Sequence, residues 1–148
     1  MKVSISDLAD KANINFGTSG LRGLVTDLSD EVYFAYPQAF LQSSPIKDKR
    51  FVIGHDLRPS SPRITQACMT AAEQLGFMCE YVGALPTPAL AYFGIKNSIP
   101  RIMVTGSHIP FDRNGIKFYR VDGEVSKEDE QSIMESTVSL PDSIDLLE

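Results

Sequence analysis

Five short runs of apolar or β-favouring residues predict the strands of a sheet. Each run is short enough for a strand and is bounded by glycine, proline or polar residues. The runs cover residues 24–26, 50–54, 77–82, 101–104 and 116–119. The last run follows Asn114-Gly115, a pair typical of turns, so we expect its strand to run antiparallel to its neighbour.

The clearest helix is predicted at 61–75, where apolar residues recur at steps of three and one and form one face. Ser61 suits the N-cap, Pro62 the first helical position and Gly76 the residue that ends the helix. We interpret the apolar face as part of the core and not as a cofactor site.

Four further helices are indicated less strongly. A short arm is expected within 1–15, and a helix over 30–41 is expected to be interrupted or shifted by Pro37. A third helix begins at Thr87-Pro88 and extends to about residue 94. The fourth follows a capping box at 126–129 and lasts about ten residues.

Because strands and helices alternate, the fold class is α/β: a layered α/β/α domain with a mixed, mostly parallel β-sheet. The chain has 148 residues, of which 43% are hydrophobic. That is enough for a substantial core, so we expect residues 1–148 to form a single domain.

Charge and cysteine content narrow the class of protein. A net charge of −5 and a pI near 5.0 argue against nucleic-acid binding, and no apolar run is long enough to span a membrane. The N-terminus lacks the apolar core of a signal peptide. Cys68 and Cys79 are not spaced as CxxC and stand in apolar surroundings, which favours buried thiols. We therefore expect a soluble protein in the reducing cytoplasm.

The segment 104–119 is the first candidate for chemistry. It runs from an apolar strand through a polar loop to a second strand, with Ser107 at the apex between Gly106 and His108. A glycine lets backbone amides approach a ligand closely, and a lysine and an arginine follow within ten residues. Hydroxyl, amides and cations together suit phosphate chemistry. A polar hairpin loop with a capping serine is the alternative.

A second candidate is FGTSGLRG at 16–23, which contains three glycines. Its glycines allow close approach to an anion, and Thr18, Ser19 and Arg22 supply hydrogen-bond donors. It lacks the lysine and spacing of a Walker A motif. A glycine-rich turn before a strand is the alternative.

Two other kinds of site have little support. The sequence around Ser107 is not the Gly-x-Ser-x-Gly elbow of a serine hydrolase. The adjacent His108 cannot be assumed to be its base. The pair His55-Asp56 lacks the spacing of a metal site.

Four motifs occur in the order seen in the α-D-phosphohexomutases, the family of phosphoglucomutases and phosphomannomutases, which the chain resembles over about residues 16–120. They are FGTSGLRG at 16–23, GHDLRPSS at 54–61, the segment from Gly83 to Pro88, and TGSHIP at 105–110 followed by Asn114-Gly115-Ile116-Lys117. Each motif alone is weak, whereas four in order are specific.

The resemblance implies a function and its cofactors. In this family the loop serine, here Ser107, is carried as a phosphoserine that donates its phosphoryl group to a hexose monophosphate. A hexose 1,6-bisphosphate intermediate then returns its other phosphate to the serine. The resemblance also implies Mg²⁺, which binds an oxygen of the phosphoserine at Ser107.

The resemblance further implies roles for neighbouring residues. Arg22 stabilises charge, because arginine is a poor proton acceptor. Lys117 is the better candidate for proton transfer, because a lysine desolvated among cations can titrate. Thr18 and Ser19 would bind phosphate with these two cations, and His108 would orient the loop or the substrate. Asp56 and Arg58 are expected to support the site, with a packing or salt-bridge role as the alternative.

The chain departs from the family pattern in two ways. The usual motif around the serine is Thr-Ala-Ser-His-Asn-Pro, and here Gly106 and Ile109 replace the alanine and the asparagine. The acidic magnesium-binding loop and the later domains of the enzyme are absent, since 122–124 resembles that loop only superficially. We therefore expect two partners, a hexose phosphate substrate and the remaining domains of the same enzyme. We expect little mutase turnover from this chain alone. A stand-alone phosphate-binding or regulatory domain is the alternative.

Overall fold

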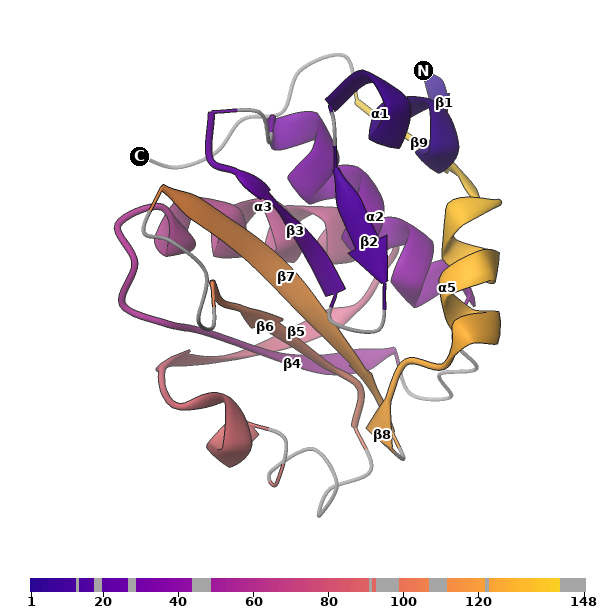
Figure 1. Cartoon of the computed structure of the whole chain (residues 1–148). Coiled ribbons are helices and arrows are strands. Elements are labelled where there is room, and N and C mark those ends of the chain that lie inside the picture. Colours follow the sequence, from indigo (N-terminus) through magenta and orange to yellow (C-terminus); the bar gives the residue numbers. More distant parts are fainter. Residues whose placement is uncertain are drawn as a thin grey trace.

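In this computed structural model the chain forms a seven-stranded mixed sheet and a separate two-stranded sheet (Figure 1). The structure describes residues 1–12, 14–17, 20–26, 29–43, 49–90, 92, 99–106, 112–121 and 123–141. The strands are β1 (Lys2–Ser4), β2 (Asn15–Gly17), β3 (Gly20–Leu24), β4 (Arg50–His55), β5 (Met78–Ala84), β6 (Arg101–Val104), β7 (Arg113–Arg120), β8 (Gly123–Glu124) and β9 (Thr137–Ser139). The helices are α1 (Ile5–Ala12), α2 (Asp30–Ser43), α3 (Ser61–Gln74) and α5 (Lys127–Met134).

The large sheet has the strand order β2-β3-β7-β6-β4-β5, with β8 paired to β7. Strand β4 runs parallel to β5 and β6. Strand β7 runs antiparallel to β6, as predicted, and also to β3. The predicted mixed α/β sheet is confirmed. Its parallel part is confined to β4, β5 and β6, because the glycine-rich segment before α2 adds the antiparallel strands β2 and β3.

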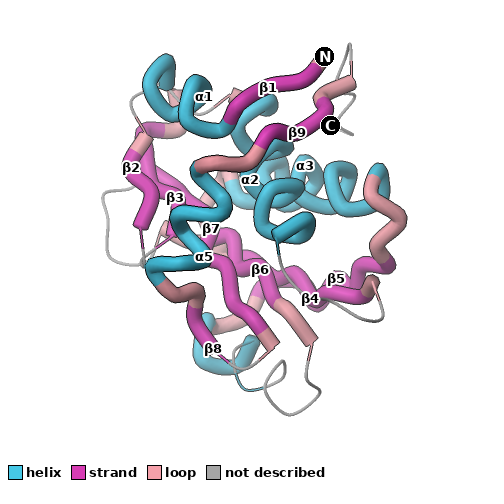
Figure 2. The backbone as a smooth tube through the Cα atoms, turned by 90° about the vertical axis from the view of Figure 1, so that its right-hand side faces the viewer, coloured by secondary structure: helices cyan, strands magenta, loops and turns pink. Residues whose placement is uncertain are grey.

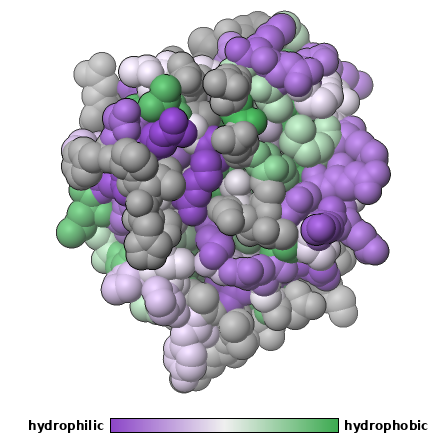
Figure 3. All heavy atoms as spheres, viewed as in Figure 1, coloured by the Kyte–Doolittle hydropathy of each residue, from purple (hydrophilic) through white to green (hydrophobic). Residues whose placement is uncertain are grey.

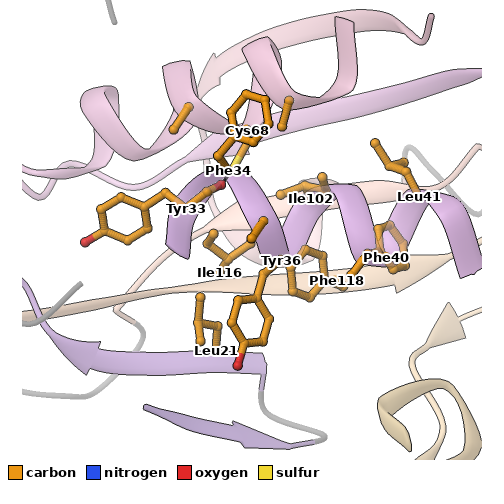
Figure 4. Close-up of a cluster of buried hydrophobic side chains, with 14 of the residues drawn as sticks. Leu21, Tyr33, Phe34, Tyr36, Phe40, Leu41, Cys68, Ile102, Ile116 and Phe118 are labelled. Atoms are coloured by element: carbon orange, nitrogen blue, oxygen red, sulfur yellow. Dashed lines mark hydrogen bonds between the residues drawn. The ribbon is translucent and has the colours of Figure 1, made fainter. Parts of the chain in front are cut away.

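The main core lies between α2 and one face of the sheet, with α3 packed beside α2 (Figure 4). Side chains from both layers are fully buried there, among them Leu21, Phe34, Ile102, Ile116 and Phe118. A smaller apolar cluster lies on the opposite face, where Leu90 from a helical turn at 87–90 covers Val52 and Met103. Helical segments thus cover both faces, which confirms the layered α/β/α architecture.

Helix α2 runs through Pro37 without interruption, contrary to the predicted break. Proline has no N–H, so the carbonyl of Tyr33, four residues earlier, loses its donor within the helix. The buried thiol of Cys68 on α3 lies 3.9 Å from that carbonyl oxygen and donates to it. Cys68 and Cys79 are free thiols, as predicted, and burial raises the pKa of the partly buried Cys79 to about 12.

Three local assignments made from the sequence are wrong. The expected strand at 24–26 stops at Leu24, where β3 ends, and residues 25–26 form a turn. Asn114-Gly115 lies inside β7, because the opposite strand β3 continues alongside it. The N-cap of α3 is Ser60, and Ser61 is already helical.

The remaining helix predictions hold with small changes. Gly76 follows α3 with φ +81°, and Ser126 caps α5 through a capping box with Asp129. Helix α1 occupies part of the predicted arm, and the preceding β1 pairs with β9, a strand that the sequence did not reveal. Figure 2 shows these two strands side by side. The helical turn at 87–90 begins at Thr87 as expected, and part of its predicted extension lies outside the described residues.

On the face seen in Figure 3, hydrophilic and hydrophobic residues are interspersed. Among the helices that the structure describes, none has both the length and the apolar character needed to cross a membrane.

We expect Gly20→Ala to destabilise the fold by about 2–4 kcal/mol, because two costs add. Gly20 has φ +86°, and an added Cβ would strike the backbone carbonyl of Ile116 in the neighbouring strand. Gly76→Ala is the matched control, since Gly76 has φ +81° but its nearest neighbour would be Lys49 Nζ at 3.8 Å. Urea denaturation should show a loss of only about 1 kcal/mol for the control. Equal losses would contradict the steric argument.

Candidate functional site

The polar loop begins where β6 ends, and the structure describes the backbone on both sides of it. Thr105 and Gly106 precede the loop, and β7 follows it. Ser107 and His108 lie outside the described residues, as do Thr18 and Ser19. The candidate site is therefore defined by the groups that bond to the backbone of residues 105–106.

Arg22 and Lys117 lie on the same face of the sheet. Arg22 on β3 is directly opposite Gly115 on β7, and Lys117 is two residues further along β7. Alternate residues of a strand share a face, and directly opposed residues do too. An added Cβ at Gly115 would lie 3.0 Å from Arg22 Nη1, so the glycine leaves room for the arginine to cross β7.

Arg22 reaches the backbone at the start of the loop. Its Nη1 donates a hydrogen bond to the carbonyl of Thr105. The amide of Thr105 in turn donates to the carbonyl of Gly115 over 3.0 Å. The backbone of Thr105 is thus held by two hydrogen bonds, one to the backbone of β7 and one from the guanidinium of Arg22.

Asp56 holds the same backbone from the β4 side. Its Oδ2 accepts from the amide of Gly106 at 3.0 Å, and its Oδ1 accepts from the hydroxyl of Ser61. Burial raises the pKa of this carboxyl, but hydrogen bonds from Ser61 and from backbone amides lower it by more. The net pKa lies below 3.8, so Asp56 is ionised at neutral pH.

Arg58 adds a second guanidinium to the start of the loop. It fills the space that a side chain at Gly106 would occupy, and its Nη1 donates to the carbonyl of Arg113 at 3.0 Å. Its Nε lies 3.4 Å from Asp56 Oδ2. Burial and the charge of Arg58 both lower the pKa of Arg22, which shows that the two cations interact. The two guanidiniums place cationic hydrogen-bond donors beside the backbone that leads into the loop, and such donors bind anions well.

Lys117 is an ion-paired cation here. Its Nζ lies 3.0 Å from Glu124 Oε1 and 5.3 Å from the centre of the Tyr119 ring. Burial lowers the pKa of Lys117, but the hydrogen bond to Glu124 and the nearby Tyr119 raise it by more. The sequence predicts that desolvation among cations lets Lys117 titrate. In the structure, β8 instead places the carboxylate of Glu124 beside the lysine, and the pKa of Lys117 is raised.

Sequence reasoning missed the contribution of Asn114 and Ser61. Asn114 is fully buried, and its Nδ2 donates to Ser60 Oγ at 2.8 Å and to Ser61 Oγ at 2.9 Å. The sequence predicts only local roles for them, a turn for Asn114 and a helix cap for Ser61. Only the contact between β7 and the start of α3 reveals their shared role, and no local pattern encodes that contact.

His55 has a structural environment. Its Nε2 lies 2.7 Å from the hydroxyl of Tyr81 on β5, and its Nδ1 lies 2.7 Å from the carbonyl oxygen of Asp56. Within the part of the chain that the structure describes, no three histidine, cysteine or carboxylate residues cluster as a metal site.

Comparison with known proteins identifies the family. Residues 13–141 match the sequence profile described as phosphoglucomutase/phosphomannomutase, alpha/beta/alpha domain I. The chain belongs to the phosphoglucomutase/phosphomannomutase family, as its domain I. The predicted resemblance is confirmed.

Individual relatives agree with this domain I assignment. A phosphomannomutase of Salmonella muenchen is 50% identical over 133 residues, covering 86% of this chain and 27% of the relative. A phosphoglucosamine mutase of Finegoldia magna is 35% identical over 136 residues, covering 88% of this chain and 30% of the relative. A crystal structure of a phosphoglucomutase/phosphomannomutase family protein from Burkholderia thailandensis superimposes with a TM-score of 0.65 at 26% identity, covering 80% of this chain and 30% of that one. The chain therefore spans about a quarter to a third of the length of these proteins.

We expect Asp56→Asn to lower the free energy of unfolding by about 2 kcal/mol at neutral pH, since hydrogen bonds to a charged group are lost. The folded pKa of Asp56 lies below 3.8. Its stabilisation is therefore complete above the unfolded pKa and disappears as the pH falls through the folded pKa. Urea denaturation of wild type and variant should give a difference that shrinks as the pH falls below the unfolded pKa of an aspartate, about 3.9.

Asp30→Asn is the control for this experiment, because it removes a carboxylate of similar exposure that is paired with the exposed guanidinium of Arg63 at 2.6 Å. A pair with an exposed partner is worth about 1 kcal/mol or less, so the control should lose less stability than Asp56→Asn. A pH-independent difference for Asp56→Asn would show that the loss is not due to its charge.

Proposed function

We propose that this domain I carries the catalytic phosphoserine, Ser107, of a phosphohexomutase that moves a phosphoryl group between the 1 and 6 positions of a hexose phosphate. One observation carries the proposal. Two guanidiniums, from Arg22 and Arg58, bracket the backbone of 105–106 immediately before the serine, in a chain of this family. Phosphoryl transfer depends mainly on positioning and charge stabilisation, which such an arrangement supplies.

The proposed reaction has two balanced transfers. In the first, a hydroxyl oxygen of the hexose monophosphate bonds to phosphorus while the bond from phosphorus to Ser107 Oγ breaks. The proton lost by the sugar hydroxyl is gained by the serine oxygen. In the second, Ser107 Oγ bonds to the other phosphorus of the hexose 1,6-bisphosphate while the bond from that phosphorus to the sugar oxygen breaks. The sugar oxygen gains the proton that the serine hydroxyl loses.

Lys117 and Arg22 have distinct proposed roles. Beside Glu124 the pKa of Lys117 is raised, so the lysine begins as a protonated acid that can protonate Ser107 Oγ as it leaves. The proton from the sugar hydroxyl then restores it. Arg22 remains charged and offsets the negative charge of the transferring group. Thr18 and Ser19 are proposed to bind phosphate, and His108 to orient the loop or the substrate.

We also propose that Mg²⁺ binds through an oxygen of the phosphoserine, with its other ligands from outside this chain. The donor chemistry fits the ion, because charged oxygen atoms are the hard ligands that Mg²⁺ prefers. When bound, the ion would neutralise phosphate charge.

The substrate class follows from what differently named relatives share. A phosphomannomutase and a phosphoglucosamine mutase match this chain over similar lengths, 133 and 136 residues. We therefore propose that the domain supplies phosphoryl transfer for a hexose phosphate, whereas the remaining domains choose the sugar. The cytoplasm is the proposed location, since these substrates are metabolic phosphates.

The alternative function is a stand-alone domain that binds phosphate or a sugar phosphate, or regulates, without turnover. An acidic magnesium-binding loop encoded after Glu148 would favour the enzyme. A stop codon directly after it, with no partner gene, would favour the binding domain.

Intact mass spectrometry of the complete gene product tests the phosphoserine. After incubation with a hexose 1,6-bisphosphate and Mg²⁺, we expect a gain of one phosphoryl group in the wild type. Ser107→Ala should not gain it, because the accepting oxygen is gone, whereas Ser126→Ala at the α5 cap should. An unmodified wild type, or a modified Ser107→Ala, would count against the proposal.

The role of Lys117 is tested by Lys117→Gln in the same protein. We expect kcat to fall by about 10²-fold or more, since proton transfer by a positioned group contributes at least this much. Lys127→Gln, at an exposed position in the first turn of α5, should leave kcat unchanged. A coupled assay of mutase turnover measures both, and equal rates for wild type and Lys117→Gln would remove Lys117 from the mechanism.

A further inference from the structure

A buried path of hydrogen bonds runs from β7 to the amide that precedes Ser107. It starts at Asn114, whose Nδ2 donates to Ser61 Oγ at 2.9 Å. Ser61 Oγ donates to Asp56 Oδ1, and Asp56 Oδ2 accepts from the amide of Gly106 at 3.0 Å. The path therefore joins β7, α3 and β4 to the start of the loop.

The direction of each bond in this path is fixed by chemistry. The amide nitrogen of Asn114 can only donate, so Ser61 Oγ must accept from it and direct its own hydrogen to Asp56. The ionised carboxylate of Asp56 can only accept. The amide oxygen of Asn114 is also engaged, since it accepts from the amide of Gly115 at 2.8 Å.

Burial makes these bonds effective restraints. Asn114 and Ser61 are both fully buried, so water cannot readily replace a lost partner. Both oxygens of Asp56 are held, Oδ2 by Gly106 and Oδ1 by Ser61 and the amide of Arg58 at 3.1 Å. The carboxylate thus has one orientation in which all its bonds are made.

The path of hydrogen bonds ends at Gly106, the residue of the path with the most flexible backbone. Glycine has the widest backbone freedom of any residue, and Gly106 immediately precedes the serine. A fixed Gly106 amide fixes the peptide plane between 105 and 106. The remaining freedom between that plane and the serine is limited to the dihedral angles of one residue.

We propose that Asn114, Ser61 and Asp56 are positioning residues that orient the Gly106 peptide and thereby place the Ser107 oxygen for phosphoryl transfer. The inference rests on the proposed function, since it assigns these residues to that reaction. None of the three is required to touch the substrate.

Nuclear magnetic resonance of the ¹⁵N-labelled chain tests the path itself. In Ser61→Ala we expect the Gly106 amide proton to shift upfield and exchange faster, because its acceptor is no longer held. Thr65→Val is the matched control, since the buried Thr65 hydroxyl on the same helix donates to the Ser61 carbonyl at 2.8 Å, outside the path. A Gly106 resonance that moves no more in Ser61→Ala than in the control would overturn the inference.

Kinetics of the complete gene product test the consequence. Misplacement of a reacting group by about 1 Å can cost on the order of 10²-fold in rate, so we expect Ser61→Ala to lose about that factor in kcat. KM should change by less than about threefold, because ground-state binding is unaffected. Thr65→Val should keep the wild-type kcat. Unchanged kcat in Ser61→Ala, with a shifted Gly106 resonance, would also overturn the positioning role.

Two features keep the outcomes distinguishable. If wild type shows no phosphorylation of Ser107, the proposed function fails and the positioning role with it, whatever the Gly106 resonance shows. If Ser61→Ala does not fold, Asp56→Asn removes the charge of the same acceptor and is expected to give the same upfield shift and kcat loss. A silent Asp56→Asn would then be the overturning result.

Discussion

The antiparallel pairing of β7 with both β3 and β6 is the constraint on which the rest of the site depends. It joins the antiparallel hairpin strands to the parallel strands and places Arg22 opposite Gly115. The same pairing returns the chain from the loop beside the strand that led into it. A one-residue slip of β7 would move Lys117 to the opposite face and bury a charge in the main core.

Charge balance follows from that geometry. Asp56 pairs with the guanidinium of Arg58 and accepts from the Gly106 amide. The carboxylate of Asp56 therefore orients the loop backbone. The charge of Lys117 is compensated separately, by the carboxylate of Glu124. The guanidinium of Arg22 also donates to the loop backbone, at the carbonyl of Thr105. Both arginines therefore lie where the loop begins, and the proposed phosphoserine would bring an anion beside them.

Local patterns predicted the elements whose ends are determined locally. The strand at 101–104, the capping box at Ser126 and the helix end at Gly76 depend on residues close in sequence, and all three were found as predicted. Pro37 and Asn114 were misassigned because a distant partner overrides the local preference. A thiol on α3 compensates for the proline, and β3 extends the strand through the turn pair. Family motifs could locate the candidate site, but only tertiary contacts could show what orients it.

The glycine at 106 and the arginine at 58 are best understood as one feature. The guanidinium of Arg58 occupies the position of a Cβ at 106, so an alanine there would require the guanidinium to move away. A side chain at residue 106 would narrow the dihedral angles of the backbone there. With glycine at this position that restraint is lost, and a second cation lies beside the loop instead. The dihedral angles of Gly106 keep the freedom that glycine allows, so the backbone before it must be held firmly. The bond from the Gly106 amide to Asp56, held in turn by a buried serine, fixes the peptide plane from which those two angles lead to the serine.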